Sequence, residues 1–207
     1  MTRLVFVACA LVLAVSAHAG DRAAAWNFDS DEAGKVAKGF SNESGAWKIA
    51  KDDTAPSKPN VLAQTASDKK APYNVTLATE SSFKDVDLSV KMKALAGEDD
   101  QGGGLVWRAK DGANYYIARF NPLEDNYRVY KVVDGARKQL GSADFKAAPG
   151  WHTLRVVMSA DHIVCYLDGE KRLDVTDSTF KEAGKVGLWT KSDAQTHFDD
   201  LTTREAK

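Results

Sequence analysis

Apolar and polar residues alternate with a period of two along most of this chain, and no other feature of the sequence restricts the fold as strongly. The segments Val86–Met92 and His152–Met158 show the alternation most clearly. A period of two places successive side chains on opposite faces of a β-strand, so each segment has one face to bury and one face for solvent. Helical periodicity is nearly absent, and a short helical turn fits only residues 31–38 or 178–183.

Three Asp-Gly pairs predict three β-hairpins in the second half of the chain. They begin at Asp111, Asp134 and Asp168, and each lies between runs of β-branched and aromatic residues. Asp-Gly tolerates the positive φ angles that tight hairpin turns need. The hairpins would join Leu105–Arg108 to Tyr115–Asn121, Tyr127–Val133 to Lys138–Ser142, and Ile163–Leu167 to Lys171–Val175. About a dozen or more such short strands predict an all-β protein, a two-sheet antiparallel sandwich or jelly roll.

The first 19 residues have the pattern of a secretory signal peptide. Arg3 precedes an apolar run from Leu4 to Val15, and Ala17-His18-Ala19 places small residues before a cleavage site. The run is shorter than the roughly 20 residues that span a bilayer, although a membrane anchor is the alternative reading. We therefore predict cleavage after Ala19 and a periplasmic or secreted domain over residues 20–207.

The charge balance and the cysteine count narrow the class of protein further. Without residues 1–19, the chain has 188 residues, of which 27 are basic and 29 are acidic. Proteins that bind nucleic acid or an anionic membrane surface need a basic excess, so neither partner is expected. Cys165 is the only remaining cysteine, which excludes an internal disulfide. No second apolar run reaches transmembrane length, and a core of one domain must supply the stability.

Several motifs after Gly102 occur in an order that resembles a known superfamily. They include Trp151-His152-Thr153-Leu154-Arg155-Val156, Tyr166-Leu167-Asp168-Gly169 and Gly187-Leu188-Trp189-Thr190-Lys191. Their order resembles the concanavalin A-like lectin/glucanase superfamily, in particular the laminin-G-like domains related to the bacterial 3-keto-disaccharide hydrolase family. The resemblance covers most of residues 20–207 and is loose before Phe83. It implies a two-sheet jelly roll whose concave face holds sugar.

A set of planar donors and aromatic rings lies on the strands that this resemblance places in or near the concave sheet. Sugar binding needs rings that cover the apolar face of a pyranose and side chains that reach its hydroxyls. The candidate ligand-binding residues are Arg108, Arg119, Asn121, Arg128, Tyr130, Trp189 and Lys191. We expect them to bind an oligo- or polysaccharide. Arginines on neighbouring strands repel one another, so such a cluster should face an acidic residue or a ligand; the alternative is that each charge is merely solvated.

The carboxylates that related hydrolases use are missing from the matching positions. The laminarin-type glucanases carry a Glu-x-Asp-x-x-Glu strand, with two glutamates about 5 Å apart for retaining chemistry. The nearest match here is residues 98–100, and Gly103 occupies the position of the second glutamate. The resemblance to the keto-sugar hydrolases implies a glutamate within residues 116–119 and Gln-Asp-His near residues 189–191, and neither is present. These departures favour binding over hydrolysis and leave any catalytic residue unknown.

Other reactive residues show no functional spacing. His152, His162 and His197 lack the spacing of metal ligands, and Cys165 lies in an apolar strand as a buried, inert thiol would. Members of the resembled superfamily often bind a structural calcium ion near the chain ends. The candidates for its ligands are Asp29, which lies near Asp31 and Glu32, and Asp199 and Asp200 near the other end. Ordinary turn chemistry is the alternative explanation for these residues.

Three hypotheses for the function remain open at this point. The first is an exported carbohydrate-binding module without a catalytic carboxylate pair. The second is a glycoside hydrolase or lyase that acts on 3-keto-glycosides or related saccharides. The third is a structural or adhesive envelope protein. The missing carboxylates favour the first hypothesis.

Overall fold

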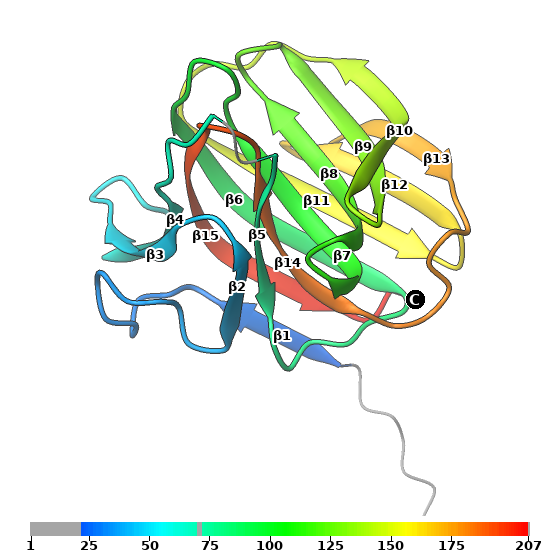
Figure 1. Ribbon diagram of the computed structural model, residues 1–207, viewed down its shortest axis with the longest axis horizontal. Coiled ribbons are helices and arrows are strands. Elements are labelled where there is room, and N and C mark those ends of the chain that lie inside the picture. The colour runs from blue at the N-terminus through cyan, green and yellow to red at the C-terminus, as the bar shows by residue number, and fades with distance from the viewer. Residues whose placement is uncertain (1–21, 70–71, 207) are drawn as a thin grey trace, which may run out of the picture.

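Two antiparallel β-sheets, stacked face to face, make up the part of the protein that its computed structural model describes, residues 22–69 and 72–206 (Figure 1). The predicted all-β, two-sheet jelly roll is thereby confirmed. Within these residues there is no helix, since residues 31–38 and 178–183 form turns and irregular segments. The same residues contain no helix that is long and apolar enough to cross a membrane. Residues 1–19 lie outside the described part, so the signal peptide stays a prediction.

The larger sheet has eight strands. They are β1 (Ala23–Trp26), β3 (Trp47–Lys51), β4 (Asn60–Gln64), β6 (Val86–Ala96), β11 (Trp151–Ser159), β12 (His162–Leu167), β13 (Glu170–Thr176) and β15 (Gln195–Arg204). Their order is β13-β12-β11-β6-β15-β4-β3, and β1 pairs with β15. The first and last strands of the chain are therefore neighbours in this sheet.

The smaller sheet has seven strands and carries most of the predicted site residues. The strands are β2 (Phe40–Ser44), β5 (Asn74–Ala78), β7 (Gly103–Asp111), β8 (Asn114–Asn121), β9 (Asn126–Val133), β10 (Ala136–Asp144) and β14 (Lys185–Thr190). Their order is β10-β9-β8-β7-β14-β5-β2. Strands from both halves of the chain thus lie side by side in one sheet.

All three Asp-Gly pairs lie in hairpin turns, but the first turn is built differently. Asp134 and Gly135 have φ angles of 49° and 77°, and Asp168 and Gly169 have 52° and 81°. At the first pair, Asp111 pairs with Asn114 across the turn, and its Oδ1 accepts the backbone N–H of Ala113 at 2.8 Å. The aspartate side chain closes this turn, so its glycine does not need a positive φ.

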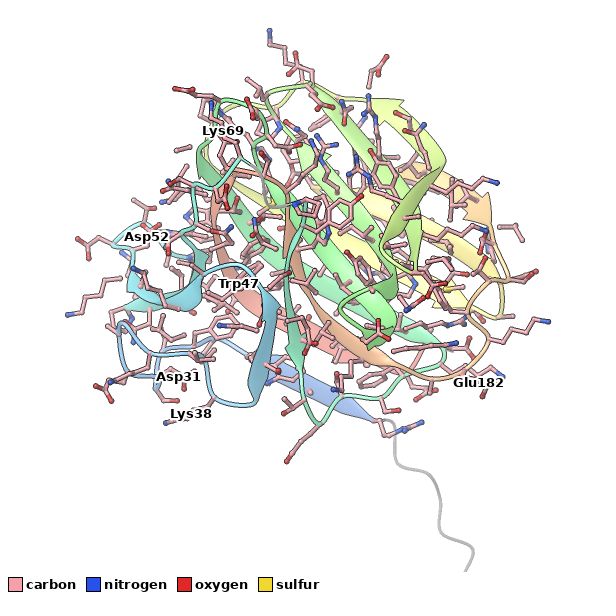
Figure 2. All side chains as sticks on the ribbon, in the orientation of Figure 1. Asp31, Lys38, Trp47, Asp52, Lys69 and Glu182 are labelled. Carbon is pink, nitrogen blue, oxygen red and sulfur yellow. The ribbon has the colours of Figure 1, made fainter. Side chains whose placement is uncertain are left out.

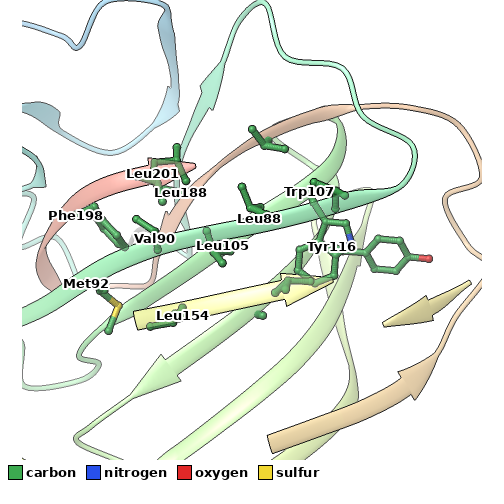
Figure 3. Packing of buried hydrophobic residues seen from close by; sticks show 14 of the residues in the cluster. Leu88, Val90, Met92, Leu105, Trp107, Tyr116, Leu154, Leu188, Phe198 and Leu201 are labelled. Atoms are coloured by element: carbon green, nitrogen blue, oxygen red, sulfur yellow. The ribbon is translucent and has the colours of Figure 1, made fainter. Parts of the chain in front are cut away.

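The space between the sheets is filled by the residues that the alternation assigned to the inner faces. Figure 3 shows Leu88, Val90 and Met92 of β6 in one cluster with Leu105 and Trp107 of β7. All five side chains are fully buried. Burial of apolar surface stabilises a fold by about 25 cal/mol per Å², so this cluster is the main source of stability in a domain without a disulfide.

Asp177 fastens the loop after β13 to the end of the sandwich. Its carboxylate accepts hydrogen bonds from Lys131 Nζ at 2.7 Å, the Tyr116 hydroxyl at 2.7 Å and the Thr179 backbone N–H at 2.9 Å. Burial acts to raise the pKa of Asp177, but these hydrogen bonds outweigh it and lower the pKa to about 2.

Replacement of Asp177 by asparagine is expected to lower the free energy of unfolding by roughly 2 kcal/mol at neutral pH. Because the folded-state pKa lies below the ordinary value of 3.8, the contribution of the carboxylate is complete above that value and is lost as the pH falls towards 2. Urea denaturation of the wild type and of Asp177→Asn at neutral and acidic pH measures it. The difference between the two proteins should shrink below about pH 4, whereas a constant difference would mean that the charge of Asp177 is not responsible.

Candidate functional site

Arg119 and Arg128 lie directly opposite each other on the paired strands β8 and β9. Like charges in this position destabilise a sheet. Glu124, in the turn between the strands, lies between them: its Oε2 is 3.2 Å from Arg119 Nη2 and 3.1 Å from Arg128 Nη1. Asn121 Oδ1 holds this turn by accepting the backbone N–H groups of Leu123 and Glu124 at 2.8 and 3.1 Å. The hairpin thus presents a bridged Arg–Glu–Arg triplet.

Asp100, in the loop between β6 and β7, extends this triplet with a second, buried carboxylate. Its side chain is 1% exposed. Its Oδ2 lies 2.9 Å from Lys191 Nζ, and its Oδ1 accepts a hydrogen bond from Asn121 Nδ2 at 2.9 Å and lies 3.4 Å from Arg119 Nη2. We call Asp100, Arg119, Asn121, Glu124, Arg128 and Lys191 the charged cluster.

The loop that contains Asp100 is held in place by contacts with two other segments at one end of the sandwich. Lys69, labelled near the top of Figure 2, places its Nζ 2.8 Å from Glu98 Oε2 and 3.6 Å from Asp99 Oδ1. The Asp193 carboxylate accepts the backbone N–H groups of residues 98, 99 and 100 at 2.7 to 3.3 Å. Segments far apart in the sequence therefore hold Asp100 in place.

The two carboxyl groups of the charged cluster have pKa values that are shifted in opposite directions. Burial raises the pKa of Asp100 and outweighs the opposing effects of Arg119 and Lys191. Burial also acts to raise the pKa of Glu124, but a hydrogen bond from Asn126 and the nearby arginines lower it below its usual range. Both carboxyl groups contact the same Arg119 guanidinium. Arg119 therefore lies between one carboxyl group with a raised pKa and one with a lowered pKa.

The rim of the charged cluster is accessible and its centre is not. The side chains of Arg128, Lys191 and Glu124 are 32%, 31% and 36% exposed, whereas Arg119 is 1% exposed. A ligand can therefore reach the three rim residues directly. Arg119 and Asp100 hold the rim residues in position from below.

The aromatic residues next to the charged cluster are covered. Trp189 and Tyr130 are 0% and 4% exposed, and they belong to a second apolar cluster, separate from the core between the sheets. Trp189 Nε1 donates to the Tyr115 hydroxyl at 3.1 Å. The turn between β7 and β8 approaches the edge strand β2, since a Cβ on Gly112 would lie 2.8 Å from Glu43 Cβ. The expected open rings for stacking on a sugar are therefore not present at these two residues.

Arg137 of β10, which sequence reasoning did not select, lies over three of these rings. Its Cζ is 4.4 Å from the ring centroid of Tyr130, 5.6 Å from that of Tyr73 and 5.7 Å from that of Trp189. These distances are within the range of cation–π attraction. Arg137 thus adds a cation to the face that carries the charged cluster.

Arg108 lies apart from the charged cluster, contrary to its inclusion in the predicted site. Its guanidinium donates to the carbonyl oxygens of Lys84 at 2.5 Å, Phe180 at 2.7 Å and Ala160 at 2.7 Å, and to Asp85 Oδ1 at 3.2 Å. The backbone at Arg108 has a φ of 47°, and the pairing of β7 with β8 is irregular there. The irregular backbone breaks the strict alternation, so the side chain is buried among loops and joins them.

The residues that complete the cluster gave only weak signals in the sequence. Asp100 lies in a glycine-rich loop that resembled a surface loop, and Glu124 lies in a turn. The signal that could have found Glu124 was the prediction that facing arginines need an acidic neighbour. Arg137 follows an Asp-Gly turn on an edge strand, where an exposed charge is the ordinary expectation.

The histidines and the remaining cysteine form no reactive site among the described residues. Each histidine pairs with one aspartate: His152 with Asp168 at 2.7 Å, His162 with Asp174 at 2.6 Å, and His197 with Asp52 at 2.8 Å. Asp52 lies in the loop between β3 and β4 (Figure 2). Cys165 is buried, and burial raises the pKa of its thiol, which lowers its reactivity.

The acidic residues considered for calcium have other partners in the structure. The Asp199 carboxylate accepts the backbone N–H and the hydroxyl of Ser57 at 2.7 and 2.8 Å, and Asp200 lies 2.9 Å from Lys91 Nζ. Asp29 Oδ1 accepts the backbone N–H of Asn60, the first residue of β4, at 3.3 Å. Over residues 22–69 and 72–206, no group of three or more His, Cys, Asp or Glu side chains could hold a metal ion. A structural calcium ion at these residues stays a prediction.

The fold and this face define the class of protein: a concanavalin A-like jelly-roll domain with a charged cluster on one sheet. The model of the 3-keto-α-glucoside-1,2-lyase-like domain family matches residues 24–204. The chain belongs to this family. A search of curated proteins finds no match.

Solved structures with the same fold include proteins that are named for carbohydrates. The carbohydrate-binding module CBM66 from Bacillus subtilis is 22% identical, with a TM-score of 0.69 over 81% of this chain and 96% of that chain. A protein of unknown function with a galectin-like fold from Bacillus subtilis is 11% identical, with a TM-score of 0.60 over 81% of this chain and 90% of that chain. The GH43 protein BlXynB from Bacillus licheniformis is 17% identical, with a TM-score of 0.53 over 82% of this chain and 39% of that chain. All three share the fold of this chain.

Proposed function

We propose that this protein is an exported carbohydrate-binding protein that holds an oligo- or polysaccharide at the accessible rim of the charged cluster. The observation that carries the proposal is the bridged arrangement of Arg119, Glu124 and Arg128, whose outer members are open to solvent. Family membership and the likeness to a carbohydrate-binding module support it.

The rim offers the groups that sugar hydroxyls need. Arg128 and Lys191 donate hydrogen bonds, and the Glu124 carboxylate accepts them. Charge-assisted hydrogen bonds of this kind are roughly twice as strong as neutral ones. Because Arg119 and Asp100 fix the rim residues before a ligand arrives, less side-chain entropy is lost on binding.

Binding to an array of oligosaccharides, followed by titration calorimetry with the best ligand, tests the proposal. We expect saturable binding by the wild type and at least about a tenfold loss of affinity in Arg128→Gln. Arg204→Gln is the matched control, because Arg204 is an exposed arginine that pairs with Asp87 on the other sheet. The control should bind like the wild type.

The outcomes separate the proposal from a structural or adhesive role. Absence of saturable binding to any saccharide would contradict the proposal and favour the structural role. Equal losses in Arg128→Gln and Arg204→Gln would also contradict it, since a general charge effect would then explain both results.

A second candidate function, cleavage of keto-glycosides, is favoured by one observation. Asp100 and Glu124 contact the same Arg119, and their pKa values are shifted in opposite directions. Such a difference separates the proton donor from the acceptor in acid–base catalysis. Only Glu124 is open to a ligand here, so Glu124 would contact the substrate and the buried Asp100 would act on it through Arg119. The sequence alone did not reveal this pair, because Asp100 and Glu124 lie in separate loops.

Incubation of the protein with 3-keto-disaccharides and with ordinary disaccharides tests this second function. Release of monosaccharide by the wild type, abolished in both Asp100→Asn and Glu124→Gln, would establish an enzyme. Binding without turnover of either substrate would leave the carbohydrate-binding function and exclude the enzymatic one for these substrates.

A further inference from the structure

Deepening the proposed function, on which this inference rests, we infer that the saccharide carries an anionic group, a carboxylate or a sulfate, which Arg137 and its cationic neighbours recognise. The arrangement around Tyr130 leads to this inference. Arg119 Nη1 donates to the Tyr130 hydroxyl at 3.4 Å, and the Arg137 guanidinium lies 4.4 Å from the centre of the ring. Two guanidinium groups therefore converge on one tyrosine.

The carboxylates nearby do not balance these cations. The cations at this face are Arg119, Arg128, Arg137 and Lys191, and the carboxylates in contact with them are Asp100 and Glu124. Asp144 of the edge strand β10 also attracts Arg128, which brings the carboxylates to three against four cations. The described residues at this face thus keep an excess of positive charge, although the whole chain has a formal charge of −1.

Both carboxylates are already used by protein groups. Asp100 accepts from Asn121 and contacts Lys191 and Arg119, and Glu124 contacts two arginines and accepts from Asn126. The contacts of Asp100 occupy both of its oxygen atoms, and Glu124 makes all of its contacts through Oε2. A ligand with its own negative charge would supply the counter-charge that these carboxylates do not provide for Arg137.

Donor groups at this face lack partners. The buried nitrogen atoms without a hydrogen-bond acceptor in residues 22–69 and 72–206 include Arg137 Nη1 at this face and Arg119 Nε beneath it, and of these two residues only Arg137 is partly exposed. Buried donors of native proteins nearly always have partners, so unpaired ones indicate an absent group. An oxyanion accepts several N–H groups at once, and Arg binds such anions through two parallel hydrogen bonds.

The aromatic rings make Arg137 a good receptor for such an anion. Tyr73, Tyr130 and Trp189 surround its guanidinium and replace part of its hydration. A charge in less polar surroundings interacts more strongly with a counter-charge than one in water does. The rings thus hold the guanidinium at the surface of the apolar cluster with one nitrogen unpaired.

Titration calorimetry with three oligosaccharides of equal length tests the inference: oligogalacturonate, a sulfated galactan fragment and neutral galactan. We expect at least about a tenfold preference for an acidic saccharide over the neutral one, and the carboxylated and sulfated arms identify the anionic group. Raising the salt concentration should weaken acidic binding more than neutral binding. Arg137→Gln should abolish the preference, while Lys138→Gln, an exposed neighbour on the same strand, should keep it.

The outcomes distinguish this inference from the proposed function. Equal affinity for acidic and neutral saccharides overturns the inference and leaves the proposed function intact. Absence of binding to every saccharide overturns the proposed function itself. If Arg137→Gln weakens acidic and neutral binding by the same factor, Arg137 only supports the aromatic cluster, and the inference also fails.

Discussion

Replacement of Arg119 by methionine is expected to lower the free energy of unfolding by about 3–5 kcal/mol. Arg119 is 1% exposed and contacts both Asp100, also 1% exposed, and Glu124. Methionine fills similar space but leaves the Asp100 carboxylate buried with only Lys191 as a cationic partner. Loss of one member of a buried ionic group costs much more than the group contributes as a whole, because the remaining charge is uncompensated.

A double-mutant cycle distinguishes lost charge compensation from lost packing. In Arg119→Met, the buried Asp100 carboxylate loses the arginine that compensates its charge, and Asp100→Asn removes that charge. We expect the double variant to be at least about 1 kcal/mol more stable than the sum of the single effects predicts. Urea denaturation of the four proteins measures the coupling. Strictly additive effects would show that Arg119 stabilises the fold through its aliphatic part alone.

The strands and hairpins could be predicted because alternation and turn signals depend only on residues that are close in the sequence. Alternation in the segments Val86–Met92 and His152–Met158 required only that one face of each strand be buried, and both segments are strands in the structure. The Asp-Gly pairs fixed the hairpins for the same reason. The pairing of β1 with β15 could not be predicted in this way, since it joins the two ends of the described chain and depends on the whole sheet.

The candidate site was predictable only where alternation applies. The face shared by Arg119 and Asn121 follows from strand alternation, and the structure places both in the charged cluster. Asp100 lies in a loop, where no periodicity fixes the direction of a side chain. Trp189 was correctly assigned to the sheet, but its burial depends on neighbours from other strands and loops.

The position of Glu124 connects the stability of the fold with the proposed function. Two arginines that face each other across a strand pair need a counter-charge, and a turn glutamate supplies it. The same contact orients Arg128 towards solvent in a fixed position. Glu124 therefore both stabilises the folded sheet and holds Arg128 in position for a ligand. Variants of Glu124 should change both the free energy of unfolding and the affinity for saccharide.

Replacement of Arg108 by methionine is expected to lower the free energy of unfolding by about 3–4 kcal/mol without changing saccharide affinity. Its guanidinium joins three carbonyl oxygens from separate segments, and the side chain is 2% exposed. Arginine and methionine have the same backbone strain at a φ of 47°, because neither is glycine. The change in unfolding free energy therefore reports the lost hydrogen bonds. The carbonyl groups of Lys84, Ala160 and Phe180 would each lose this partner, and that of Phe180 is buried.

Lys181→Met is the matched control, because Lys181 is an exposed cation in the loop that contains Phe180. Its unfolding free energy should stay within about 0.5 kcal/mol of the wild type. Saccharide affinity is then measured at a temperature where Arg108→Met is folded. Arg108 contacts no member of the charged cluster among its hydrogen-bond and ion-pair partners, so the affinity of the folded variant should equal that of the wild type. A large loss of affinity with unchanged stability would return Arg108 to the binding site and contradict its role as a link between loops.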